Sequence, residues 1–164
     1  MACKIYRKLL VNKNPRNGGK PQNNSYIVIH NIGYGTAESC WSWFNKCLHG
    51  QGRDGIACQY TIDDKEGYQM LEDNWGAGHT RGDGHYKGFN RDPEGKINNG
   101  NAIGIEVGDR NVDIDQAIEN AIELTRYLMQ CYNIPIQNVV RHGDTQNKYC
   151  PEVIMNRGKW DYML

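Results

Sequence analysis

The chain has 164 residues, a length that fits one domain with a substantial core. Nineteen lysines and arginines balance nineteen aspartates and glutamates, so no net charge draws the protein toward nucleic acid or an anionic membrane. A mean hydropathy of −0.76 and the lack of a long apolar run exclude membrane insertion. The first eleven residues carry charge where a signal peptide needs an apolar core, so we expect synthesis in the cytoplasm without a signal peptide.

The hydrophobic periodicity and the turn residues predict alternating strands and helices. In chain order we expect a surface loop over 12–24, a strand over 26–30, a helix from Thr36 to about His49, strands over 57–62 and 68–71 around a turn over 63–67, a glycine-rich loop over 73–101, a strand over 102–108, a helix over 115–132 capped by Asp113 or Asp115, and a strand over 138–141. This order predicts an α/β (α+β) fold with a central mixed β-sheet flanked by helices. The boundaries we expect are an N-terminal segment over 1–24 and one catalytic domain over 25–164.

Two histidines and one cysteine have the character of metal ligands. His142 follows the strand over 138–141, and Cys150 lies eight residues later across a polar, turn-rich stretch that can fold back. His30 ends the apolar strand over 26–30. Each residue alone fits ordinary packing, because strand-end histidines and buried thiols are common. Together they form a zinc ligand set that leaves a fourth position open, which is typical of a catalytic metal.

Two charged residues accompany these candidate ligands. Glu106 lies within an apolar strand, where a carboxylate is unfavourable unless it is paired or used. It either points to solvent at the strand end or acts as a general base whose pKa is raised by burial. Lys148, two residues before Cys150, is either a solvated loop charge or a group that stabilises an oxyanion.

The long loop over 73–101 contains seven glycines and several aromatic residues. Loops of this length are usually functional, and we predict that this one forms a wall of a substrate groove. His79 would line that groove or support a neighbouring ligand. Trp75 would contact substrate or anchor its own loop.

Five segments in order carry a family resemblance, namely Ile27–His30, Tyr60–Asp64, Gly82–Gly84, Asn101–Glu106 and Arg141–Pro151. Together they resemble the zinc-dependent N-acetylmuramoyl-L-alanine amidases of the type 2 family, which includes phage endolysins and shares its fold with peptidoglycan recognition proteins. The resemblance covers about residues 25–160.

The resemblance implies Zn²⁺ held by His30, His142 and Cys150, with Glu106 and Lys148 as catalytic residues. It implies hydrolysis of the amide between N-acetylmuramic acid and L-alanine in bacterial peptidoglycan by zinc-activated water. An endolysin catalytic domain of this kind would be a monomer, made in the bacterial cytoplasm and acting on the cell wall after release.

The chain departs from the family pattern at three places. Ile32 replaces a threonine, Cys58 stands where some members have a tyrosine, and the usual Ala-Trp-His is stretched between Trp75 and His79. The second departure favours Glu106 as the base. Three alternatives stay open: a non-catalytic peptidoglycan-binding module of the same fold, a hydrolase of another amide bond, and an unrelated structural zinc domain.

Overall fold

The computed structural model describes residues 3–11, 23–33, 35–47, 56–80, 92 and 94–164. In chain order its elements are β1 (Lys4–Arg7), β2 (Tyr26–Asn31), α1 (Ala37–Cys47), β3 (Tyr60–Ile62), β4 (Glu66–Gln69), β5 (Ala102–Val107), α2 (Ile114–Tyr132), a 3₁₀ turn (Ile136–Asn138), β6 (Val139–Arg141), α3 (His142–Thr145), α4 (Glu152–Asn156) and α5 (Trp160–Met163). Among the described residues, none of the helices combines the length and the apolar character that crossing a membrane would require.

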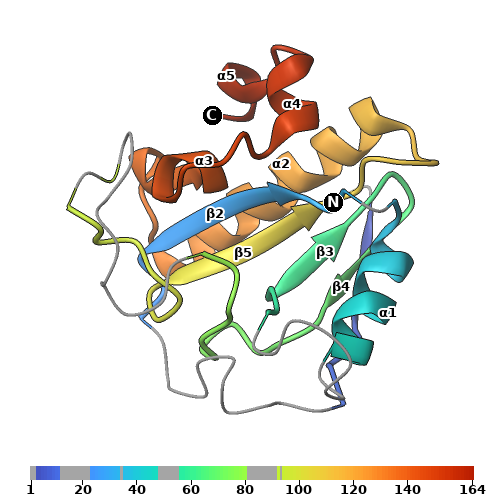
Figure 1. Ribbon diagram of the computed structural model, residues 1–164, viewed down its shortest axis with the longest axis horizontal. Helices are drawn as coiled ribbons and strands as arrows, with labels where there is room; N and C mark the ends of the chain where they lie inside the picture. Colours follow the sequence, from blue (N-terminus) through green and yellow to red (C-terminus); the bar gives the residue numbers. More distant parts are fainter. Residues whose placement is uncertain (1–2, 12–22, 34, 48–55, 81–91, 93) are drawn as a thin grey trace.

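The six strands form one mixed sheet in the order β1-β4-β3-β5-β2-β6 (Figure 1). Strands β3, β5, β2 and β6 are parallel to one another, whereas β4 runs antiparallel to β3 and pairs in parallel with β1. The parallel strands therefore end at one edge of the sheet, where their loops can bring side chains together. The expected mixed sheet flanked by helices is confirmed.

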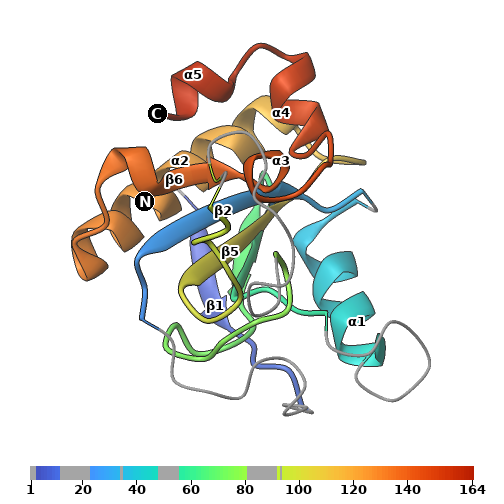
Figure 2. The ribbon, with the colours of Figure 1, turned by 60° about the vertical axis from the view of Figure 1, so that its left-hand side comes forward.

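The two faces of the sheet have different roles. One face packs against α2, and its side chains belong to the main core cluster, as Ile27, Ile29, Ile103 and Ile105 illustrate. Helix α1 packs on the opposite face with a second apolar cluster. Figures 1 and 2 show α2 behind the sheet and α1 beside β3 and β4 on the other side. Because side chains alternate along a strand, His30 and Glu106 lie on the face opposite α2.

The helix ends follow from local chemistry. The Asp113 side chain accepts a hydrogen bond from the backbone N–H of Gln116, so Asp113 is the cap of α2. The helix ends at Asn133, whose φ of 53° lies in the left-handed region. The prediction of this helix is confirmed to within one residue.

The sequence analysis missed one strand. Residues 4–7 pair in parallel with β4 and form an edge of the sheet, although they fall in the segment that we expected to precede the domain. Strand β3 is also shorter than expected, over 60–62 instead of 57–62, and β4 lies two residues earlier than expected, over 66–69 instead of 68–71. The end of the first helix beyond residue 47, the Gly82–Gly84 turn and most of the polar stretch over 12–24 lie outside the described residues.

Candidate active site

The structure brings His30, His142 and Cys150 together at the ends of two adjacent parallel strands. His30 lies in β2, and His142 begins α3 directly after β6, which pairs with β2. Their ring centroids are 4.3 Å apart, and the ligand-capable atoms of the three residues lie within 4.8 Å of one another. The convergence that the sequence predicted for these residues is therefore present in the fold.

The segment from His142 to Cys150 folds back on itself, and a hydrogen bond and a close approach of the backbone at Gly143 hold its two ends together. The backbone N–H of Gly143 donates to the carbonyl of Cys150 at 2.8 Å. A Cβ added at Gly143 would lie 2.5 Å from the carbonyl oxygen of Lys148, so only glycine fits this close approach. The cysteine thereby returns to the histidine that opens the segment.

A partly buried ion pair between Arg141 and Asp144 orients the start of this segment. The Asp144 carboxylate is fully buried and accepts from the Arg141 guanidinium at 2.7 and 3.0 Å and from the Arg141 backbone N–H at 2.9 Å. These three hydrogen bonds join the end of β6 to α3 and fix the position of His142 between them.

A second carboxylate holds the turn that follows His30. Asp109 accepts from the Asn31 side-chain amide at 3.0 Å and from the backbone N–H groups of Gly33 at 2.6 Å and Gly35 at 3.2 Å. Burial raises the pKa of Cys150 to about 12, and a hydrogen bond from the Asn31 backbone lowers that pKa in part. The turn thus ties the end of β2 to both the sheet and the candidate cysteine ligand.

Glu106 lies beside His30 in the sheet register, with its Oε1 atom 4.0 Å from His30 Nδ1. Its side chain is 14% exposed, and burial raises the pKa of Glu106 to about 8. The Cys58 thiol is 3.8 Å from the same oxygen. Glu106 therefore points into the site rather than to bulk solvent, and its raised pKa suits proton transfer near neutral pH.

Lys148 is exposed on the folded-back segment. The pKa of Glu106, which burial raises, is lowered in part by the positive charge of Lys148. The same charge adds to burial in lowering the pKa of His30. The lysine thus acts electrostatically on both groups from the open side of the site.

The two predicted substrate-contacting residues lie deeper than expected for a groove wall. His79 is 6% exposed, and its ring contacts His30 on one side and the Ala102 carbonyl on the other. Trp75 is partly buried against the apolar cluster under α1, and its carbonyl accepts from the Gln59 side chain. Contact of either residue with substrate stays a prediction.

The chemistry of the donor set fits a metal ion. Burial lowers the pKa of His142 to about 3 and that of His30 well below its ordinary value, so both imidazoles are neutral and offer lone pairs. Among the described residues, the buried Nε2 atom of His142 has no hydrogen-bond partner. A second grouping of His30, Cys58 and His79 exists, but there the two imidazoles bond each other directly at 3.0 Å. We therefore assign the candidate metal position to His30, His142 and Cys150.

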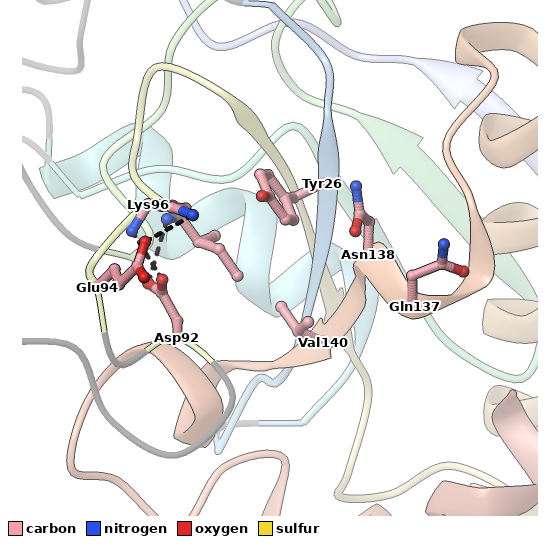
Figure 3. Close-up of a pocket in the computed structure, with 8 residues that line it drawn as sticks. Tyr26, Asp92, Glu94, Lys96, Gln137, Asn138 and Val140 are labelled. Atoms are coloured by element: carbon pink, nitrogen blue, oxygen red, sulfur yellow. Dashed lines mark hydrogen bonds and ion pairs between the residues drawn. The ribbon is translucent and has the colours of Figure 1, made fainter.

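A pocket of about 310 Å³ lies near the other end of β2 (Figure 3). Its residues come from the beginning of β2, the glycine-rich loop and the segment around β6, namely Tyr26, Asp92, Glu94, Lys96, Ile97, Gln137, Asn138 and Val140. The Asp92 carboxylate accepts from the backbone N–H groups of Lys96 and Ile97, which shapes this part of the loop. Glu94 and Lys96 form an exposed ion pair at 2.6 Å. Since Val28, Ala102 and Val140 form one cluster beside the pocket, it lies on the same face of the sheet as His30.

Sequence reasoning did not find the supporting residues. The Arg-His-Gly-Asp run offered a signal for the pairing of Arg141 with Asp144, because the two residues are three apart. Asp109 offered none, since its partners lie more than 70 residues earlier in the chain. The pocket likewise joins segments that are distant in sequence.

Solved structures define the fold class. The catalytic domain of XlyA is 25% identical, with a TM-score of 0.76 over 98% of this chain and 96% of that one. PlyL is 28% identical, with a TM-score of 0.72 over 99% of this chain and 94% of that one. The chain thus has the fold of these two structures.

Sequence comparison gives the family. The family described as N-acetylmuramoyl-L-alanine amidase (Amidase_2) matches residues 20–153, and the chain belongs to it. The amidase CwlH of Bacillus subtilis is 30% identical over 145 residues, which are 85% of this chain and 51% of CwlH. The amidase CwlA of the same organism is 27% identical over 98% of this chain and 55% of its own length. The chain therefore spans about half the length of these curated relatives.

Proposed function

We propose that the protein is a zinc-dependent hydrolase of bacterial peptidoglycan that cleaves the amide between the lactyl group of N-acetylmuramic acid and L-alanine of the stem peptide. The observation that carries this proposal is the convergence of His30, His142 and Cys150 beside the buried carboxylate of Glu106. Family membership supports the choice of bond. An endolysin role, with action on the wall after release from the cytoplasm, agrees with this assignment.

His30, His142 and Cys150 would hold the zinc ion. A bound zinc ion with three protein ligands lowers the pKa of water to about 7 and polarises a carbonyl group. The two histidines contribute neutral imidazoles, and Cys150 contributes the one anionic ligand. Burial raises the pKa of the Cys150 thiol to about 12, and the hydrogen bond from the Asn31 backbone offsets this rise only in part. A bound zinc ion would supply the positive charge that keeps the sulfur as a thiolate.

Glu106 has the position and pKa of a general base. Its carboxylate lies next to His30 and accepts a proton from the attacking water, then returns it to the amine of L-alanine as the amide bond breaks. Burial raises the pKa of Glu106 to about 8, which favours the protonated form that donates to the leaving amine. A bound zinc ion would lower this pKa and favour the carboxylate that accepts the water proton. Lys148 provides a positive charge for the oxygen of the attacked carbonyl.

The pocket at the far end of β2 provides room for an extended arm of the substrate. Tyr26 and His30 are four residues apart on one strand, which corresponds to about 13 Å. A peptide of about four extended residues spans that distance. We infer that the stem peptide extends toward this pocket, with the charged pair of Glu94 and Lys96 beside its distal residues.

Product analysis on purified peptidoglycan tests this function. Zinc-loaded protein should release peptides with new amino-terminal alanine and create no new reducing sugar ends, as mass spectrometry would detect. Cys150→Ser should abolish this release and retain little zinc. Binding to the wall without any cleavage would instead identify a peptidoglycan-binding module, and new reducing ends would identify a glycosidase.

A further inference from the structure

We infer that His79 is a positioning residue that holds His30 in one tautomer, with its proton on Nε2, and so reserves the Nδ1 lone pair for the metal. This role deepens the proposed function and rests on it for the metal at His30. Of the two roles that the sequence analysis left open for His79, this inference favours support of a neighbouring ligand over contact with substrate.

A chain of two hydrogen bonds leads from the backbone to His30. The Nε2 atom of His79 lies 3.0 Å from the carbonyl oxygen of Ala102, and its Nδ1 atom lies 3.0 Å from Nε2 of His30. A carbonyl oxygen only accepts, so His79 Nε2 must carry a proton and donate it. A neutral imidazole has a single N–H, and the Nδ1 atom of His79 is therefore an acceptor.

The same count of protons determines the tautomer of His30. Its Nε2 atom must donate to the acceptor on His79, and a neutral His30 then has its lone pair on Nδ1. Both rings are almost completely buried, at 3% and 6% exposure, and an unpaired charge there would be strongly unfavourable. The Nδ1 atom faces the site, where it lies 4.0 Å from Oε1 of Glu106.

The fold provides a fitted place for the His79 ring. A Cβ at Gly104 would lie 2.6 Å from the Cys58 sulfur and 2.7 Å from Cγ of His79, so the ring packs directly on the backbone of β5. The Asn99 side chain accepts from the backbone N–H groups of His79 at 3.1 Å and Thr80 at 2.9 Å, which anchors the loop at His79. The ring meets His30 edge-on, at 81°.

These contacts indicate that His79 acts on the metal only through the ligand His30. An imidazole ligand whose other nitrogen donates to a fixed acceptor is held in orientation and becomes more basic. Removal of such an acceptor typically weakens metal affinity by about 10–100-fold. We expect that loss when His79 is replaced by a residue that fills the space but accepts no hydrogen bond.

The test compares His79→Phe, which keeps a ring but has no acceptor, with His79→Gln, which keeps one acceptor and one donor. Zinc dissociation constants are measured by chelator competition on folded protein, with melting curves alongside. We expect about 10–100-fold weaker binding for the phenylalanine variant and near wild-type binding for the glutamine variant. Equal affinity of folded His79→Phe and wild type would overturn the inference.

A second measurement needs no variant and no metal. Long-range ¹H–¹⁵N correlation on histidine-labelled, metal-free protein reports the tautomer of each ring. The inference expects the Nε2–H form for both His30 and His79, and an Nδ1–H form at His30 would contradict it. A wild type that shows these tautomers and the expected zinc affinities but releases no amino-terminal alanine supports the role of His79 and refutes the proposed function.

Discussion

Gly143→Ala should separate the two ends of the segment that carries His142 and Cys150. The added Cβ would lie 2.5 Å from the carbonyl oxygen of Lys148, which is backbone and cannot rotate away. Ordinary contact begins near 3.4 Å, so the segment must shift by roughly 0.9 Å (3.4 − 2.5). That shift would strain the 2.8 Å hydrogen bond from Gly143 to Cys150.

The expected magnitude combines two effects. Overpacking costs about 1–3 kcal/mol and a weakened hydrogen bond about 0.5–1.5 kcal/mol, so we expect the variant to be about 2–4 kcal/mol less stable. For a domain of this size that corresponds to a drop in Tm of about 5–15 °C. Metal ligands tolerate displacements of only about 0.2 Å, so zinc affinity should fall by more than about tenfold.

Thermal melts and chelator competition measure both effects. Gly100→Ala is the matched control, because the same methyl group there meets only the end of the Asn98 side chain at 3.2 Å. The control should melt and bind zinc almost as the wild type does. A Gly143→Ala protein with wild-type zinc affinity and an unchanged Tm would refute the account of how this segment is closed.

Three further predictions concern catalysis, pH and the pocket. Glu106→Gln and Lys148→Ala should fold and retain zinc but lose about 10²-fold or more in kcat, because removal of a general base or an oxyanion donor typically has that effect. Near wild-type turnover of the Glu106→Gln variant would mean that another residue is the general base. Burial depresses the folded-state pKa of His142 from 6.5 to about 3, so its contribution to stability of up to about 5 kcal/mol is fully present above pH 6.5 and is lost as the pH falls toward 3. Urea melts of metal-free protein should therefore show a falling free energy of unfolding over that window. A flat profile would contradict the burial argument. Lys96→Ala should raise KM for stem-peptide substrates several-fold with little change in kcat. The control Lys65→Ala, on the exposed turn between β3 and β4, should change neither constant. Equal effects of the two substitutions would show that the pocket does not bind the substrate.

The sequence predicted the elements whose signal is local. The helix over 114–132 has apolar residues at helical spacing and a capping aspartate, and the β2 and β5 strands are continuous apolar runs. Strand β1 lacked such a signal, because only its Ile5 packs partly against the core while its neighbours are exposed. An edge strand of this kind is specified by its partner strand rather than by its own pattern.

In the site, too, some residues could be predicted from local sequence and the contacts that hold them could not. His30, Glu106 and His142 could be predicted because polar residues in or directly after apolar strands stand out in sequence. Cys150 could be predicted because it follows His142 across a short, turn-rich stretch. The contacts that hold them could not, since the His30 to His79 bond joins residues 49 apart. Whether Trp75 touches substrate is a question of the same kind, and its packing against the apolar cluster under α1 predicts a large loss of Tm when it is removed.

X-ray absorption at the zinc edge tests the central claim most directly. The account predicts one zinc ion per chain with two nitrogen neighbours at about 2.0–2.1 Å and one sulfur neighbour at about 2.3 Å from His30, His142 and Cys150. The sulfur neighbour should disappear in Cys150→Ser. A zinc shell without sulfur in the wild type, or an active wild type that holds no metal, would contradict it.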